Sequence, residues 1–399
     1  MAARRENPST GARRPPVAAA LALIAVLLMC LLPSAALAHG KGHHKKSDKV
    51  RVMTRNVYLG ADLGPGLAAT TPAEFFAANG GILRQVTRTN FPLRAEALAR
   101  EIKRAHADLV GLQEVALWRT APPSLGPVVS GPSATTVRYD FLQLLLDELN
   151  KGKKKPLYRT VVVQEEFDFE APADENGVAD DGPDAPDGLL ADAEINGRLT
   201  MRDVILARNK TTRTFNPQGG HFENLLNVTV SGIPIEVTRG WTSVHAKVKK
   251  SRWFHFVNTH LEAFDDETQV PSIRAQQASE LVAPGGPARA FPLPVILVGD
   301  LNSDTATEVQ AGDAQAHQVM LGAGFVNRDT SNPLSCCLGD PDLVGGSLAD
   351  FDHKVDHVMT SSPNIVTLKR SRVFGLGKVN GLFPSDHAGI ASWLRLTRP

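Results

Sequence analysis

The sequence predicts a single α/β or α+β sandwich, in which two β-sheets pack together and helices cover the outside. Short runs of β-branched and aliphatic residues outnumber the helical patterns, and the helical patterns lie between those runs. No internal repeat or interdomain linker divides the chain. A length of 399 residues allows one large domain or two ordinary ones, and the lack of a linker favours one.

The predicted strands are apolar runs bounded by glycine, proline or polar turn residues. In chain order they cover residues 50–54, 108–115, 158–164, 201–207, 225–230, 241–248, 253–259, 295–299, 354–359 and 388–396. Helices are predicted where apolar residues recur at helical spacing, at 93–105, 139–150, around 276–281 and at 305–322. Residues 60–72 and 120–136 are rich in Gly, Pro and other small residues and are expected to be loops.

The N-terminus predicts export. Arg13 and Arg14 precede an apolar run over residues 17–32, and residues 36–38 have the small-x-small form of a cleavage site. Residues 1–38 are therefore expected to be a signal peptide, and the mature chain to be secreted; a retained anchor is the alternative. Residues 39–48 are expected to be a flexible His/Lys/Gly linker, and residues 49–399 a single domain.

The charge of the chain gives it no general attraction to nucleic acid or to anionic membranes. Its formal net charge is +1, and the first 38 residues carry four Arg against one Glu, so the remainder carries −2. Residues 165–194 are rich in Asp, Glu, Pro and Gly and are expected to form an acidic surface insertion. A Ca²⁺ site is conceivable there, although the spacing matches no EF-hand loop.

Asp300 and Asn302 follow an apolar run that ends at Gly299. Residues two apart in extended chain point the same way, so both side chains can face one spot at the end of a strand. A carboxylate beside an amide suits a water molecule that must be held and deprotonated next to a metal-bound phosphate. Taken alone, the turn could equally be an Asx turn that caps the strand.

Other predicted strands also carry polar groups, most of them at strand ends. The set comprises Asn56, Glu114, His260, Asp300 with Asn302, Asp386 with His387, and Asp356 within a strand. Carboxylate and amide oxygens suit Mg²⁺ or Mn²⁺, whereas zinc would favour closer groups of His and Cys. Singly, Glu114 could be a surface acid, His260 a loop histidine and Asp386-His387 a turn.

Six short motifs follow one another along the chain. They are Thr54-Arg55-Asn56, Leu112-Gln113-Glu114, Asn258-Thr259-His260-Leu261, Gly299-Asp300-Leu301-Asn302, Lys354-Val355-Asp356-His357-Val358 and Ser385-Asp386-His387. The set resembles the endonuclease/exonuclease/phosphatase superfamily, which includes pancreatic-type deoxyribonucleases, abasic-site repair endonucleases, neutral sphingomyelinases and inositol-polyphosphate 5-phosphatases. Each motif alone is common, but their order over about residues 50–396 is specific.

The resemblance implies a four-layer αββα sandwich, with two mixed sheets face to face and the site at one end of them. It implies that Glu114, with Asn56 nearby, binds Mg²⁺ or Mn²⁺, and that Asp386 lies near the metal or the water. Arg202 and Asp203 match a strand where the family often carries a substrate-facing polar residue.

The resemblance also implies the catalytic roles. Asp300, oriented through Asn302, would activate the attacking water. His260 and His387 would stabilise the phosphate or protonate the leaving oxygen, and Asp356 would orient His387.

Two details separate this chain from parts of the family. Tyr58 stands where the repair endonucleases carry an acid, so a second metal ligand of that type is not expected. His260 follows the pattern of the deoxyribonuclease, sphingomyelinase and inositol-phosphatase branches, and Tyr58-Leu-Gly-Ala-Asp62 resembles exported bacterial members.

The implied function is an exported, Mg²⁺-dependent hydrolase of phosphate esters, with endonuclease or other phosphodiesterase activity as the first expectation. A sphingomyelinase- or phospholipase C-like lipid phosphodiesterase and a phosphatase of small metabolites are the alternatives. A non-catalytic binding module is the alternative of a different class, and the retention of every motif argues against it. No obligate protein partner is evident, and a monomer is expected.

Cys336 and Cys337 are the only cysteines left once the signal peptide is removed. Because they are adjacent, they cannot join distant segments. In an oxidising compartment they are expected to form a vicinal disulfide, with free thiols as the alternative. Redox catalysis is not expected, because a Cys-x-x-Cys spacing is absent.

Overall fold

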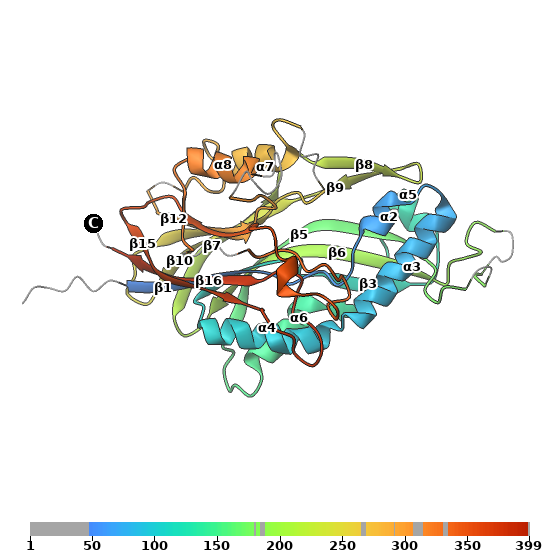
Figure 1. Cartoon of the computed structure of the whole chain (residues 1–399), viewed down its shortest axis with the longest axis horizontal. Coiled ribbons are helices and arrows are strands. Elements are labelled where there is room, and N and C mark those ends of the chain that lie inside the picture. Colours follow the sequence, from blue (N-terminus) through green and yellow to red (C-terminus); the bar gives the residue numbers. More distant parts are fainter. Residues whose placement is uncertain are drawn as a thin grey trace, which may run out of the picture. The chain divides into compact units, whose positions relative to one another are not determined.

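Two mixed β-sheets lie face to face in the fold (Figure 1). The computed structural model describes residues 48–178, 181–183, 188–264, 269–290, 292–305, 314–329 and 334–397. The larger sheet has the order β15–β16–β1–β2–β6–β3–β4, with β5 also paired to β6. Its strands are β1 (Asp48–Asn56), β2 (Leu109–Gln113), β3 (Leu117–Ala121), β4 (Thr136–Asp140), β5 (Tyr158–Ala173), β6 (Ile195–Arg208), β15 (Val366–Phe374) and β16 (Gly389–Leu396).

The smaller sheet has the order β13–β14–β12–β11–β10–β7. Its strands are β7 (Thr212–His221), β10 (Gly240–Val248), β11 (Phe254–His260), β12 (Val295–Asp300), β13 (Val326–Asn327) and β14 (Asp356–Thr360). Parallel pairing joins β1 to β2 and β11 to β12, so each sheet places two adjacent carboxyl ends at one edge. A separate hairpin is formed by β8 (Leu226–Val230) and β9 (Ile233–Val237).

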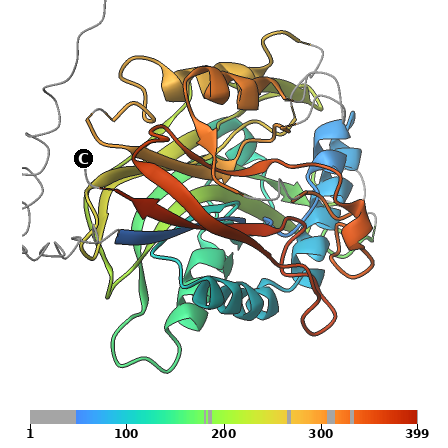
Figure 2. The same ribbon diagram turned by 60° about the vertical axis from the view of Figure 1, so that its left-hand side comes forward.

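Helices cover the outer face of each sheet (Figure 2). The larger sheet carries α3 (Pro72–Arg88), α4 (Phe91–Ala105) and α6 (Phe141–Asn150), and the smaller sheet carries α7 (Ile273–Val282) and α8 (Gln315–Gly322). In α4, Ala95, Leu98 and Ile102 recur at helical spacing and are fully buried against the sheet. Short helices are α2 (Gly64–Ala68), α5 (Gly126–Ser130) and the 3₁₀ turn η1 (Leu348–Asp350).

Side chains along a strand point alternately toward the core between the sheets and toward the outer helices. In β12, Ile296 and Val298 belong to the core between the sheets, whereas Val295 and Leu297 pack with residues of α7 and α8. Successive side chains of a strand point to opposite faces, so an unbroken apolar strand is buried on both sides. The four-layer αββα sandwich predicted from the sequence is therefore confirmed.

Helix α3 was not predicted from the sequence. Its start carries a capping box, in which the Thr71 side chain accepts the N–H of Glu74 and the Glu74 side chain accepts the N–H of Thr71. Pro72 at the first helical position adds a second start signal. The pair Gly80-Gly81 lies within the helix and hides this pattern from a propensity argument. The predicted loops at 60–72 and 120–136 contain α2 and α5.

The predicted acidic insertion is wrong over its first third. Strand β5 continues to Ala173 and pairs with β6 along its length. Phe167, Phe169 and Ala171 alternate with acids in this stretch, which is a strand pattern that the acidic composition concealed. Neither of the two His/Cys/Asp/Glu clusters that could hold a metal among the described residues lies within 165–194, so the Ca²⁺ site there stays a prediction.

Some predicted segments fall outside the described residues. The signal peptide over 1–38 and the linker over 39–47 are among them, and Asp48 already belongs to β1. The predicted helix at 305–322 is found as α8 from Gln315, and residues 306–313 are not described. Of the helices that are described, none has the length and apolarity needed to cross a membrane.

A ladder of buried amides and hydroxyls joins the two sheets behind the strand ends. Gln113 Nε2 on β2 donates to Asn258 Oδ1 on β11 at 2.5 Å. Asn258 Nδ2 donates to the Leu112 carbonyl and to Thr242 Oγ1, both at 3.2 Å. Gly111 lets the sheets approach here, because a Cβ at that position would lie 2.3 Å from Asn258 Oδ1 and 2.5 Å from Val298 Cγ2.

We expect Gly111→Ala to lower the free energy of unfolding by about 1–3 kcal/mol, because the added methyl group must displace Asn258 or Val298 from a packed interface. Denaturant unfolding measures this change. Gly322→Ala is the matched control, because a Cβ at that exposed end of α8 meets nothing within 4 Å. A Gly111→Ala protein as stable as the wild type would contradict the close approach of the sheets.

Candidate active site

The predicted site residues lie where neighbouring strands of the two sheets end. Strand β1 ends at Asn56, β11 at His260 and β12 at Asp300. His260 is the register partner of Asp300, and Asp300 is the register partner of Asp356 on β14. The pairing of the strands therefore collects these polar groups at one edge of the sandwich.

Asn56 is a hydrogen-bond bridge at the centre of the site. Its Nδ2 donates to Glu114 Oε1 at 2.9 Å and to Asp300 Oδ2 at 3.1 Å. Both partners are carboxylates, which only accept when ionised, so the amide nitrogen faces them. The amide oxygen accepts the N–H of Tyr58 at 2.9 Å. Asn56 thus joins Glu114 to Asp300, and its role as a metal ligand stays a prediction.

Glu114 follows β2 with a left-handed backbone, at φ 58°. Such a value is uncommon for a residue with a side chain. Two hydrogen bonds hold the Glu114 side chain in place: Oε2 accepts the N–H of Leu59 at 2.8 Å, and Oε1 accepts from Asn56. Burial raises the pKa of the Glu114 carboxyl, and the charge of Asp386 adds to the increase. Two carboxylates that repel each other in this way suit a divalent cation.

A cavity of about 360 Å³ opens beside Glu114 and Asp386. Arg239 and Asp62 are the other charged residues on its wall. Most of the remaining wall is apolar, formed by Leu59, Ala61, Leu63, Leu67, Phe167, Met201, Val237, Ala263, Phe264, Leu338 and Pro341, with Tyr58 beside them.

His387 and Asp356 form a buried pair. His387 Nδ1 lies 2.9 Å from Asp356 Oδ2 and 3.7 Å from Asp300 Oδ2. Burial alone would lower the pKa of His387, but Asp356, Asp300 and Asp386 outweigh it and raise that pKa well above its ordinary value. The structure therefore places Asp356 where the sequence predicted it, as the partner of a charged imidazole.

The pKa of His260 is shifted in the opposite direction from that of His387. Burial, then the charges of Arg239 and His387, lower the pKa of His260 well below its ordinary value, so its imidazole is neutral. Arg239 Nη1 lies 3.3 Å from His260 Nδ1, and a guanidinium can only donate. The proton of His260 therefore sits on Nε2, which lies 3.7 Å from Asp300 Oδ2.

Arg239 was missed in the sequence analysis. It is buried, pairs with Glu262 at 3.4 Å, and lies just before β10. The only signal in the sequence is a lone arginine before an apolar strand, and its distance from every motif gave no reason to connect it with His260.

Asp300 lies between the two histidines and its carboxylate is held at both oxygens. Oδ1 accepts the N–H of Asn302 at 2.9 Å, and Oδ2 accepts from Asn56. Asn302 has a left-handed backbone at φ 46° and donates its amide to the Leu261 carbonyl at 2.9 Å. Burial raises the pKa of Asp300, while the charge of His387 opposes that increase.

Arg202 does not join the other site residues. Its Nε donates to the Val115 carbonyl at 2.9 Å and its Nη2 to Asp140 at 2.6 Å. It is buried and supports the turn after Glu114, so these contacts give no support to a substrate-facing role. Asp203 is fully buried, and its burial raises the pKa of its carboxyl well above the usual value, with Arg239 opposing the increase and Glu114 adding to it.

Two buried arginines from outside the predicted set position the chain around His387. Arg55 pairs with Glu101 at 3.1 Å and donates to the His387 carbonyl at 2.5 Å. Arg94 donates to the carbonyls of Val57 at 2.7 Å and of Pro384 at 3.1 Å. Arg55 joins β1, and Arg94 joins the segment after β1, to the segment that carries Asp386 and His387.

Cys336 and Cys337 are joined as a disulfide beside the site. The Sγ atoms lie 3.5 and 3.9 Å from His387 Nε2. The pair therefore forms part of the wall around the imidazole nitrogen that does not contact Asp356.

A model of the endonuclease/exonuclease/phosphatase family matches residues 78–387. The chain belongs to the endonuclease/exonuclease/phosphatase family. Members of this family hydrolyse phosphate esters and generally use divalent metal ions. The match begins after Asn56 and includes Glu114, both histidines, Asp300 and Asp356.

Solved structures of the endonuclease/exonuclease/phosphatase family share the fold. A family protein from Bacteroides vulgatus is 17% identical with a TM-score of 0.51, covering 88% of this chain and 99% of that one. A family protein from Leptotrichia buccalis is 14% identical with a TM-score of 0.50, covering 86% and 99%. A comparison with curated proteins found no match.

The raised pKa of His387 predicts a direct observation. Nitrogen NMR of the imidazoles should find His387 protonated at pH values where an ordinary histidine, with a pKa of about 6.5, has lost its proton, and His260 neutral with its proton on Nε2. The proton on His387 is lost only as the pH rises through this raised pKa. Asp356→Asn should therefore lower the pKa of His387. An unchanged pKa in that variant would show that the pair does not hold the proton.

Proposed function

We propose that this protein is an exported phosphodiesterase that uses Mg²⁺ or Mn²⁺. The arrangement of Asp300 carries the proposal, since it lies 3.7 Å from a neutral imidazole on one side and 3.7 Å from a protonated one on the other. A carboxylate, a hydrogen-bond donor and an acid within reach of one another are the groups that hydrolysis at phosphorus needs.

Glu114 and Asp386 would hold the metal ion, because both carboxylates border the same cavity and the charge of Asp386 adds to the raised pKa of Glu114. Their oxygen donors fit a hard divalent cation. When bound, the ion would neutralise charge on the phosphoryl oxygens.

Asp300 would act as the general base. Its oxygens are fixed by Asn302 and Asn56, and burial raises the pKa of its carboxyl toward the working range of a base. The carboxylate takes one proton from a water molecule as the water oxygen bonds to phosphorus.

The histidines would act on the phosphate. His260 can donate its Nε2 proton to a phosphoryl oxygen, because Arg239 occupies Nδ1. His387, kept protonated by Asp356, can give its Nε2 proton to the leaving oxygen as the bond from phosphorus to that oxygen breaks. The water proton ends on Asp300 and the leaving group departs as an alcohol, so the charges balance.

The N-terminal pattern supports export, with cleavage near Ala38. The substrate is a phosphodiester met outside the cell, and the protein acts as a monomer without an obligate partner. A nucleic acid, a phospholipid and a small phosphoester share the reacting group, so the cavity beside the site must distinguish them.

We expect Asp300→Asn to lower kcat by about 10²- to 10⁴-fold on a chromogenic phosphodiester, because the amide cannot accept the water proton. The thermal unfolding midpoint should stay close to that of the wild type, since the side chains have the same shape. Glu96→Gln on the exposed face of α4 is the control and should not change kcat. A rate within tenfold of the wild type in Asp300→Asn would exclude Asp300 as the base.

Removal of metal ions should abolish turnover, and Mg²⁺ or Mn²⁺ should restore it. Glu114→Gln should raise the metal concentration needed for half-maximal activity by about 10- to 100-fold, and calorimetry with Mn²⁺ should show the same loss of affinity. Glu148→Gln, in an exposed ion pair on α6, is the matched control. Full activity after chelation would refute the metal requirement.

A further inference from the structure

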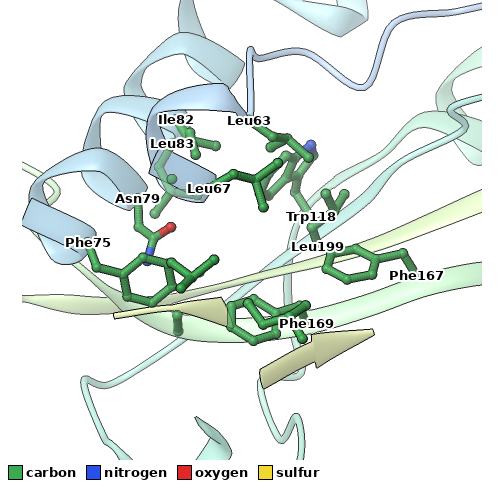
Figure 3. Close-up of a pocket in the computed structure, with 15 residues that line it drawn as sticks. Leu63, Leu67, Phe75, Asn79, Ile82, Leu83, Trp118, Phe167, Phe169 and Leu199 are labelled. Carbon is green, nitrogen blue, oxygen red and sulfur yellow. The ribbon is translucent and has the colours of Figure 1, made fainter. Parts of the chain in front are cut away.

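The cavity beside Glu114 and Asp386 is called the catalytic cavity from here on. A second cavity lies next to it, between α2, α3, the strands β5 and β6, and the hairpin β8–β9 (Figure 3). Its volume is about 80 Å³, against about 360 Å³ for the catalytic cavity. Leu67, Phe75 and Phe169 surround its centre in Figure 3. The other lining residues are Leu63, Gly66, Asn79, Ile82, Leu83, Trp118, Phe167, Ala171, Gly197, Leu199, Val230 and Ile235.

The two cavities share walls. Leu63, Leu67 and Phe167 line both of them. Two further strands border both cavities. On β6, Met201 lines the catalytic cavity and Leu199 the second one, and on β9, Val237 lines the catalytic cavity and Ile235 the second one. Side chains two apart in a strand lie on the same face, so these strands form a continuous apolar floor.

The lining offers a ligand almost no polar partner. Trp118 donates its indole N–H to the Leu59 carbonyl at 2.8 Å, so only its carbon surface remains. Asn79 donates one amide N–H to the Pro172 carbonyl at 3.1 Å, which leaves its oxygen and its second N–H as the remaining side-chain polar groups. The other lining side chains are aliphatic or phenyl groups, or are absent at glycine.

This lining discriminates between substrate classes. A nucleobase would bury ring nitrogens and exocyclic groups without hydrogen bonds, which costs free energy for each of them. A hydrocarbon chain loses nothing of that kind and gains from leaving water. The small volume also suits a narrow chain better than a fused ring.

We propose that this cavity, the apolar subsite, binds the hydrocarbon chain of a phosphoester whose phosphate lies in the catalytic cavity. The inference rests on the proposed phosphodiesterase function and specifies its substrate class. The chain would run from the phosphate past Leu63, Leu67 and Phe167 into the space that Phe75 and Phe169 border.

The test is calorimetric titration of the protein, in the presence of Mg²⁺, with ethyl, butyl, hexyl and octyl phosphonate below their micelle concentrations. We expect affinity to rise about threefold to fourfold for each methylene group until the subsite is full. Ile235→Trp should abolish this dependence on chain length, because its ring fills the subsite. An affinity that does not change with chain length in the wild type would overturn the proposal.

Ile233→Trp is the matched control. Ile233 lies on the same face of β9, two residues from Ile235, but does not line the subsite, so this variant should keep the chain-length dependence. An equal loss in both variants would show a general effect on the hairpin and would overturn the assignment. Should Ile235→Trp fail to fold by thermal unfolding, Ala171→Val narrows the subsite from β5 and should weaken octyl phosphonate more than ethyl phosphonate.

Calorimetric titration with adenosine monophosphate tests whether the subsite binds a nucleobase instead. If Ile235→Trp weakens its binding more than that of octyl phosphonate, the subsite takes a base and the proposal fails. The outcome is separable from that of the proposed function, because binding of phosphonates requires no turnover. Binding that depends on chain length, without phosphodiester hydrolysis, would refute the proposed function and support the subsite. Hydrolysis without a dependence of binding on chain length would support the proposed function and refute the subsite.

Discussion

The hydrogen bond between Gln113 and Asn258 is the contact on which the site depends most. It joins the two sheets at 2.5 Å, directly before Glu114 on one strand and two residues before His260 on the other. Both amides are fully buried, so separating them would leave donors and acceptors without partners, at about 1–3 kcal/mol for each group. Glu114, Asp386 and His387 lie next to strands of the larger sheet, whereas His260 and Asp300 end strands of the smaller one, and this bond fixes one group relative to the other.

The chemistry of the site follows from placing several carboxylates around one buried imidazole. Asp356, Asp300 and Asp386 lie around His387, which keeps its proton because these carboxylates outweigh the cost of its burial. His260 faces Arg239 instead and stays neutral. One fold thereby produces an acid and a neutral donor from the same residue type, and the difference lies in which charge each ring meets.

The sequence predicted the strand ends because each motif is local. Asp300 and Asn302 follow an apolar run within a few residues, so the strand and its polar end are visible together. Arg239 and His260 are 21 residues apart and meet only through the pairing of β10 with β11. The contacts of Arg202 were not foreseen for the same reason, since its partners Val115 and Asp140 lie on other elements, and its substrate-facing role stays a prediction. Contacts between distant segments need the strand pairing, which no local pattern supplies.

Strand β5 shows how one composition can hide two functions. One of its acids, Asp168, pairs with Arg198 at 2.6 Å, while Phe167, Phe169 and Ala171 on alternate positions line the apolar subsite. A composition argument averages the two faces and predicts an acidic loop. The alternation instead gives β5 an apolar face, which lines the catalytic cavity at Phe167 and extends beyond it to Phe169 and Ala171. The same period of two that sets the layers of the sandwich therefore also extends the wall of the cavity beside Glu114 into the apolar subsite.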